Sequence, residues 1–253
     1  MLFRSLALIQ AEELLVPEID LERLTGRWID WQRRDGRGIG TWTSIALDHI
    51  AANHEPPATT GGRAPNGSLA RCVPVGLATA GNPRNLVSGT YHLAFLLHPD
   101  PRCAWGAVAV NVALARFLHA KRDFIPDVIE ALRNNETPEE LLAAVRRVPL
   151  EKREDLPVVG PAAGYVVHCM EIALWFAHHE PNLQRGLIWL ASAGGDTDTN
   201  AAVAGALMGA RDGEEAIPSR WLDAIPGVDH IRALADALVG LCTTRAPEPK
   251  EQH

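Results

Sequence analysis

The chain has 253 residues, 47% of them hydrophobic, which is enough apolar material for one sizeable core. It carries 24 basic and 31 acidic residues, and the net charge of −7 argues against nucleic-acid binding, whose footprint would be basic. The four cysteines, at 72, 103, 169 and 242, form no Cys-x-x-Cys pair. This usage predicts free thiols in a reducing compartment, and we expect a cytoplasmic protein.

No segment has the pattern of a membrane or secretory signal. Residues 1–10 are apolar but lack a basic start and a small-residue cleavage site. The longest apolar run, 103–118, is interrupted by Asn111 and Arg116 and falls short of the roughly 20 residues of a spanning helix. We therefore expect no membrane contact.

Apolar residues recur with helical spacing throughout the chain, whereas alternating β-branched residues are almost absent. The pattern predicts an all-α fold, a compact single-domain orthogonal helical bundle. The expected helices run near 2–14, 20–34, 41–52, 67–80, 84–97, 103–120, 124–134, 138–147, 163–179, 183–193, 199–211 and 228–242.

Short glycine- and proline-containing turns separate these helices, and none of the turns is long enough to be an interdomain linker. We expect one helical domain over residues 1–244. Residues 245–253, rich in proline and charge, are expected to be a flexible tail.

The segment 194–200, Gly-Gly-Asp-Thr-Asp-Thr-Asn, precedes a helix in which Ala201, Gly205 and Gly209 recur every four residues. A stripe of small residues suits a central helix, so we expect its N-terminus to open inside the protein. Asp196 and Asp198, with threonine hydroxyls, are hard oxygen ligands of the kind that Mg²⁺, Mn²⁺ or Ca²⁺ prefers.

An alternative interpretation of this segment needs no metal. Asp198 or Thr199 could be an ordinary N-cap, with Asp196 in the preceding turn. Gly194 and Gly195 would let a backbone approach a ligand closely, or could end the preceding helix.

The segment 61–68, Gly-Gly-Arg-Ala-Pro-Asn-Gly-Ser, opens another expected helix. Glycines before a helix N-terminus can form an anion site, but the same string fits a flexible loop in which Asn66 or Ser68 caps the helix. His98 ends a helix and Tyr165, after Gly164, begins one. Neither position by itself separates a binding role from ordinary packing.

Taken together, these strings resemble the ADP-ribosylglycohydrolase family. The match is carried by residues 66–71, 164–167, 171–175, 194–199 and 217–222, and it covers nearly the whole chain. The string Gly-Gly-Asp-Thr-Asp-Thr before an alanine- and glycine-rich helix is its most specific element.

The resemblance implies an all-α hydrolase with divalent ions, Mg²⁺ or Mn²⁺, that removes ADP-ribose from a modified protein or small molecule. The implied metal ligands are Asp196, Asp198 and Thr199, of which the two aspartates are also the implied catalytic residues. The implied ligand-binding residues are Asn66, Gly67 and Ser68 at the pyrophosphate, His98 at the ribose or phosphate, Gly164 and Tyr165 at the adenosine, and Gly195.

The chain departs from the family pattern at its start. Family members carry a Thr-Asp-Asp-Thr motif that supplies further metal ligands, but this sequence contains no Asp-Asp pair and no acidic residue between Glu55 and Asp100. Either the sequence begins at an internal methionine of a longer protein, or it is a short homologue that binds ADP-ribose with little hydrolysis and holds one ion instead of two. A third alternative is a structural relative that binds nothing.

Overall fold

Helices account for nearly all of the regular structure in the computed structural model, which describes residues 2–160 and 162–244. The α-helices are α1 (Leu2–Leu14), α2 (Leu21–Arg34), α3 (Thr41–Asn53), α4 (Leu69–Thr79), α5 (Pro83–Leu97), α6 (Pro101–Leu118), α7 (Ile125–Arg133), α8 (Glu139–Arg147), α9 (Val166–His179), α10 (Leu183–Ser192), α11 (Thr197–Asp212), α12 (Ser219–Leu222) and α13 (Val228–Thr244). Three short 3-10 helices accompany them: η1 (Asn66–Ser68), η2 (Arg153–Asp155) and η3 (Glu214–Ala216).

The all-α prediction is confirmed. The described part of the chain contains no strand, only an isolated bridge between Pro65 and Tyr165. Within it, no helix combines the length and the apolarity needed to cross a membrane. The expected flexible tail, 245–253, lies outside the described residues.

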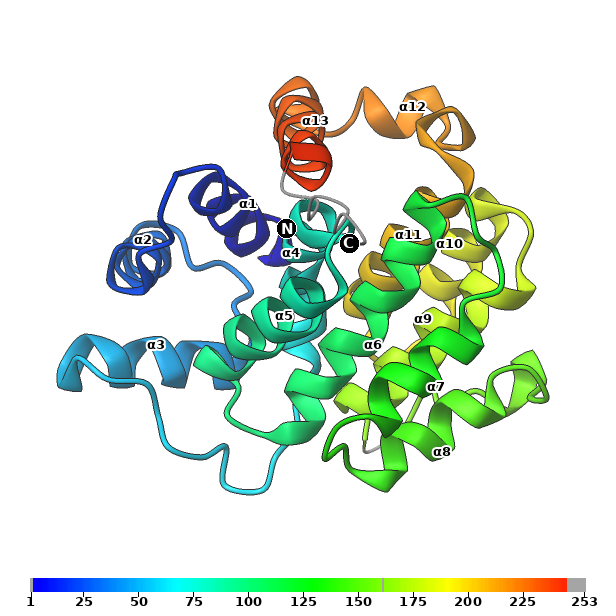
Figure 1. The fold of residues 1–253 in the computed structure, drawn as a ribbon, viewed down its shortest axis with the longest axis horizontal. Helices are drawn as coiled ribbons and strands as arrows, with labels where there is room; N and C mark the ends of the chain where they lie inside the picture. Colours follow the sequence, from blue (N-terminus) through cyan, green and yellow to red (C-terminus); the bar gives the residue numbers. More distant parts are fainter. Residues whose placement is uncertain (1, 161, 245–253) are drawn as a thin grey trace, which may run out of the picture.

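The core is built around α6 and α9, which are apolar on nearly all sides, with Asn111 and Glu171 as buried exceptions. Every residue from Cys103 to Ala115 is buried, as is every residue from Cys169 to Ala177. A helix that is apolar all round must be surrounded by other helices. Figure 1 shows α6 crossing the centre of the molecule, and α4, α5, α9 and α11 pack against it.

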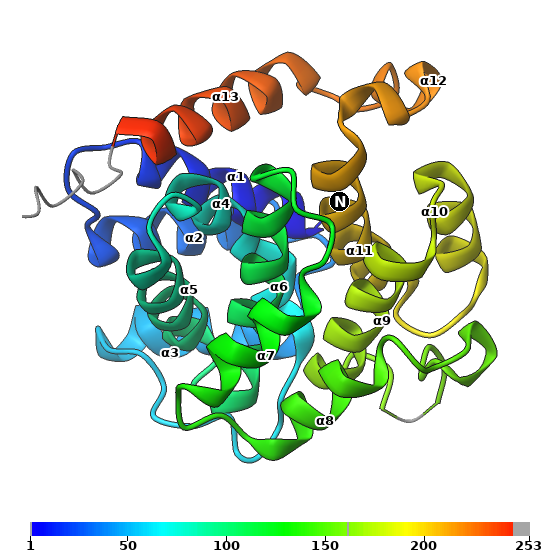
Figure 2. The same ribbon diagram turned by 45° about the vertical axis from the view of Figure 1, so that its right-hand side comes forward.

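A second hydrophobic cluster joins α1, α2 and α3 to α4, α5 and α13. Its largest member, Trp28, is fully buried, and its indole Nε1 donates to the Leu6 carbonyl at 3.1 Å. Helix α13 runs across α4 and α1 (Figure 2).

Two helices begin two or more residues later than the sequence predicts. Helix α4 begins at Leu69 because residues 66–68 form η1, and α9 begins at Val166 because Gly164 and Tyr165 are not helical. The backbone of residues 64–66 pairs with residues 164–166, and this long-range pairing takes precedence over local helical preference. Helix α12 and the 3-10 helices are also absent from the prediction.

Candidate functional site

Two segments separated by about a hundred residues pair before η1 and α9. The Asn66 amide donates to the Gly164 carbonyl at 3.0 Å, and the Val166 amide donates to the Ala64 carbonyl at 2.8 Å. Gly164 has a φ of +87°, a backbone conformation that glycine adopts without strain. This pairing brings the strings around Asn66 and Gly164 to one place.

The N-terminus of α11 meets this pairing. Asn66 Nδ2 donates to Asp196 Oδ2 at 2.7 Å, and Thr199 Oγ1 donates to Asp196 Oδ1 at 2.8 Å. A Cβ on Gly164 would lie 3.4 Å from Asp196 Oδ2, so the glycine borders the carboxylate directly. Both oxygens of Asp196 are therefore oriented by side chains from different parts of the sequence.

Neither Asp198 nor Thr199 is an N-cap, because α11 already begins at Thr197. Asp196 occupies the N-cap position of α11, yet its side chain accepts no capping hydrogen bond from the helix backbone. Its carboxylate is committed to Asn66 and Thr199 instead. Asn66 and Ser68 likewise cap no helix with their side chains.

The expectation that α11 opens inside the protein is wrong. Asp198 is exposed and Asp196 half-buried, and only Thr199 and Asn200 in the first turn are buried. Close packing occurs further along the helix at Gly205, where a Cβ would lie 3.1 Å from Leu187 of α10. The acidic cluster is consequently open to ligands and solvent.

The two carboxyl groups influence each other. Loss of hydration around the carboxyl and the neighbouring Asp196 raise the pKa of Asp198. Asp196 also influences Cys169, which is buried beneath the cluster. Burial and the Asp196 charge raise the pKa of this thiol. A bound cation would offset the repulsion between Asp196 and Asp198.

His98 and Ser68 lie beneath the site instead of facing it. Both side chains are fully buried. A Cβ on Gly67 would lie 2.8 Å from His98 Nε2, so only glycine fits above this imidazole. Ser68 Oγ donates to the Cys103 carbonyl at 3.0 Å, which ties η1 to α6. In this geometry His98 and Ser68, both predicted to bind the ligand, support the turn at Gly67 from beneath.

A buried arginine secures the same turn. Arg71 is fully buried and donates to the Gly67 carbonyl at 2.9 Å and to the Ala94 carbonyl near the end of α5 at 3.1 Å. Its Nη1 lies 3.1 Å from His98 Nδ1. Burial and the Arg71 charge hold the pKa of His98 well below its usual range, so the imidazole is neutral.

Gly195 is required for packing against another loop. It has a φ of +70°, and a Cβ on it would lie 1.9 Å from the Val158 carbonyl oxygen. The backbone that comes close to Gly195 is therefore that of residues 156–160. Gly194, also at positive φ, follows the C-cap of α10.

Sequence reasoning missed three polar residues beside Tyr165: Asp100, Arg102 and Glu140. Arg102 pairs with Asp100 at 2.7 Å, and the Tyr165 hydroxyl donates to Glu140. Asp100 before Pro101 is a recognisable helix-start signal, and its side chain does cap α6. No local pattern marks Arg102 or Glu140.

The site can be tested for its fit to a divalent ion. Asp196, Asp198 and Thr199 offer two carboxylates and a hydroxyl, the hard oxygen donors that Mg²⁺ and Mn²⁺ prefer. Among the residues described, no three side chains of the His, Cys, Asp and Glu types gather into a group that could hold a metal. The donors present fit part of the coordination of one ion.

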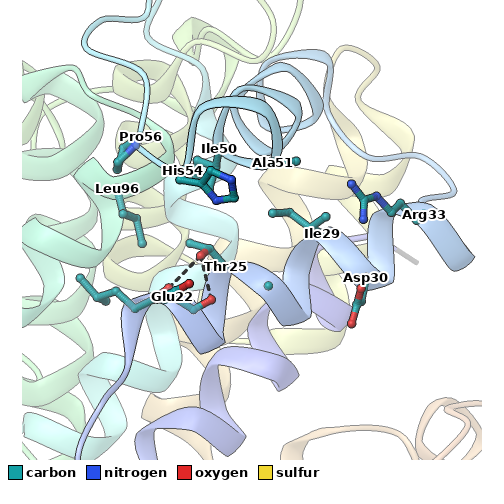
Figure 3. A pocket seen from close by; sticks show the side chains of 12 residues that line it. Glu22, Thr25, Ile29, Asp30, Arg33, Ile50, Ala51, His54, Pro56 and Leu96 are labelled. Atoms are coloured by element: carbon teal, nitrogen blue, oxygen red, sulfur yellow. Dashed lines mark hydrogen bonds between the residues drawn. The ribbon is translucent and has the colours of Figure 1, made fainter.

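A separate cleft of about 610 Å³ lies between α2, α3 and the end of α5. Figure 3 shows His54 and Ile50 on one side of it, across from Thr25 and Ile29. None of the residues that line this cleft belongs to the cluster around Asp196.

The family model for ADP-ribosylglycohydrolase matches residues 1–248. The chain belongs to the ADP-ribosylglycohydrolase family. The resemblance drawn from residues 66–71 and 194–199 is thereby confirmed, while the assignment of individual site residues stays a prediction.

Curated relatives place the chain among proteins named for ADP-ribose removal. It is 32% identical to the ADP-ribosyl-[dinitrogen reductase] glycohydrolase of Rhodospirillum rubrum over 71% of this chain and 58% of the relative. It is 27% identical to ADP-ribosylhydrolase ARH3 of Danio rerio over 84% of this chain and 69% of that protein. The chain thus spans little more than half the length of the Rhodospirillum relative.

A solved structure shares the fold. An ADP-ribosylglycohydrolase-related protein complex contains a chain that superimposes with a TM-score of 0.80 at 29% identity, covering 95% of this chain and 81% of that one. The helical arrangement described above is therefore that of this family.

Proposed function

We propose that this family member binds an ADP-ribosyl group at the cluster around Asp196 and hydrolyses the bond between C1 of the distal ribose and its acceptor. The observation that carries the proposal is the 2.7 Å hydrogen bond from Asn66 to Asp196, which joins two family strings 130 residues apart. Gly164 lies against the same carboxylate. A ligand bound there would contact all three strings at once.

The proposed roles follow the positions of the side chains. Asp196, Asp198 and Thr199 would hold Mg²⁺ or Mn²⁺, which when bound would orient the ribose hydroxyls and lower the pKa of a bound water. Asn66 and Thr199 fix both oxygens of Asp196. Asp198, together with Asp196, would also serve as a catalytic carboxylate at the reacting centre.

The remaining residues would position the ADP-ribosyl group. The backbone at Asn66 and Gly67 would border the pyrophosphate, and Gly164 with Tyr165 would border the adenosine. His98 and Ser68, both fully buried, would act from beneath by holding the turn that contains Gly67.

A second candidate function is ADP-ribose binding with little hydrolysis. It is favoured by the composition of the acidic cluster, in which Asp196, Asp198 and Thr199 leave most positions of an octahedral ion to water. The ligand-binding contacts come from other segments and do not depend on a complete metal site.

Two experiments separate these functions. Calorimetry measures the binding of ADP-ribose, and a Mn²⁺-dependent assay measures the release of ADP-ribose from modified arginine and serine peptides. We expect Asp198→Asn to slow release by about 100-fold, the typical contribution of a positioned acid or base. Its matched control is Asp236→Asn on the exposed side of α13. Binding without release supports the second function, and a chain that neither binds nor releases ADP-ribose contradicts both.

Metal binding has its own readout. Titration of Mn²⁺ followed by electron paramagnetic resonance should show weaker binding for Asp196→Asn and for Thr199→Val than for Asp236→Asn. Equal affinity in all variants would mean that the ion, if bound, is held by other residues.

A further inference from the structure

Arg102, in the first turn of α6, contacts four different segments. Its Nε and Nη2 donate to the two oxygens of Asp100 at 2.9 and 2.7 Å. Nη2 also donates to the Gly62 carbonyl at 2.8 Å, and Nη1 reaches within 3.5 Å of the Tyr165 hydroxyl and 3.8 Å of Glu140. One guanidinium thus links α6, the loop before η1, the start of α9 and α8.

The anchor of this guanidinium is itself rigid. Asp100 is 7% exposed, caps α6 by accepting from the Arg102 amide at 2.9 Å, and accepts from Thr60 Oγ1 at 3.4 Å. A planar guanidinium bound at two atoms by a fixed carboxylate has little freedom. Arg102 therefore differs from a surface arginine that pairs with a single mobile acid.

Tyr165 is held from two sides. Its hydroxyl donates to Glu140, and the Arg102 guanidinium lies 5.8 Å from the centre of its ring. The ring also contacts His168 edge-on, with the ring centres 5.1 Å apart, and packs against the core, so Glu140 and Arg102 fix its polar end. The ring has one face and one edge fixed by charged groups.

We propose that Arg102 and Glu140 are positioning residues, which hold Tyr165 and the loop at residues 60–66 in the arrangement that receives the ligand. The consequence for ADP-ribose rests on the proposed function, whereas the positioning itself does not. A side chain already fixed in its bound conformation loses less entropy on binding, so the network raises affinity without touching the ligand.

The network acts on the backbone pairing that builds the site. Gly62 lies two residues before Ala64, whose carbonyl accepts from the Val166 amide, and Tyr165 lies between Gly164 and Val166. Arg102 holds both sides of this pairing at once. Removing the contacts of Arg102 should weaken this backbone pairing while the helices remain intact.

Amide hydrogen exchange tests the positioning without any ligand. In Arg102→Lys and Glu140→Ala we expect the Asn66 and Val166 amides to exchange about tenfold faster, because each variant removes a hydrogen bond of a charged group, with the interior of α6 unchanged. The matched control is Arg146→Gln, which removes an arginine of α8 whose one ion-pair partner among the described residues is Glu139 at 2.8 Å. Unchanged exchange at Asn66 and Val166 in both variants would overturn the proposal.

A double-mutant cycle on ADP-ribose affinity tests the consequence. Glu140 is exposed, and Tyr165→Phe keeps the ring that packs against the core, so Glu140→Ala and Tyr165→Phe should both fold. Each should bind ADP-ribose about tenfold more weakly. Because both remove the same hydrogen bond, the double variant should bind as weakly as either single one. Additive losses would mean that Glu140 does not act through Tyr165, which overturns its positioning role.

The hydrogen-exchange and affinity experiments together separate this inference from the proposed function. A wild-type chain that binds no ADP-ribose contradicts the proposed function, and the exchange result then decides the positioning by itself. Faster exchange with unchanged ADP-ribose affinity would refute the link between the network and binding.

Discussion

Substituting Gly195 by alanine tests why the loop before α11 contains adjacent glycines. A Cβ at this position would lie 1.9 Å from the Val158 carbonyl oxygen, whereas real Cβ atoms essentially never come within 3.0 Å of another atom. The two backbone segments would have to separate by about 1 Å. The residue would also carry the strain of a φ of +70°.

Gly194 supplies the matched control. It has a φ of +83°, so alanine there meets the same backbone strain, roughly 1–2 kcal/mol. Its nearest neighbour is Val159 Cγ1 at 3.2 Å, the end of a side chain that can move. The backbone clash is therefore confined to Gly195.

We expect Gly194→Ala to lower the free energy of unfolding by about 1–2 kcal/mol and Gly195→Ala by about 2–5 kcal/mol, since overpacking adds to the backbone strain. Urea unfolding followed by circular dichroism measures both. Equal losses in the two variants would refute the claim that residues 156–160 approach Gly195 too closely for a side chain.

Three further predictions concern stability measured by denaturant unfolding. Gly26→Ala should stabilise the protein by about 0.5–1 kcal/mol, because Gly26 lies inside α2 with nothing within 4 Å of an added Cβ; a loss would show that the space is filled. Trp28→Phe should cost about 2 kcal/mol through a cavity and the lost bond to the Leu6 carbonyl, and a neutral result would contradict the burial of this indole. Burial, opposed by Arg147, raises the pKa of Glu171 from 4.5 to about 7, so its contribution is complete below pH 4.5 and is lost as the pH rises to 7. Unfolding at several pH values should therefore give wild type a decline over this window of up to about 3 kcal/mol that Glu171→Gln lacks, and parallel curves would contradict the raised pKa.

The helices could be predicted closely from the sequence because their causes are local. The expected 2–14, 20–34 and 183–193 appear as Leu2–Leu14, Leu21–Arg34 and Leu183–Ser192. Apolar spacing, together with caps such as Asp20 and Asn182, determines where a helix begins and which face is buried. These signals lie within a few residues of the element that they specify.

The errors arose where distant segments compete with local preference. Residues 163–165 fit a helix by themselves, but the backbone of residues 164–166 pairs with residues 64–66, and α9 starts late. Of the Ala201, Gly205 and Gly209 stripe, Gly205 packs closely against α10, whereas an added Cβ at Gly209 would meet nothing within 4 Å. The stripe also contained no information on which end of α11 would reach the surface.

The sequence by itself determined the all-α class, the helix positions and the family strings around Asn66, Gly164 and Asp196. The tertiary structure alone decided that Asn66 bonds Asp196, that His98 is buried beneath Gly67, and that Arg102 holds Tyr165. The Asn66–Asp196 and Arg102–Tyr165 contacts join residues 130 and 63 positions apart. Such contacts depend on how the helices pack as a whole, and no local spacing encodes that arrangement.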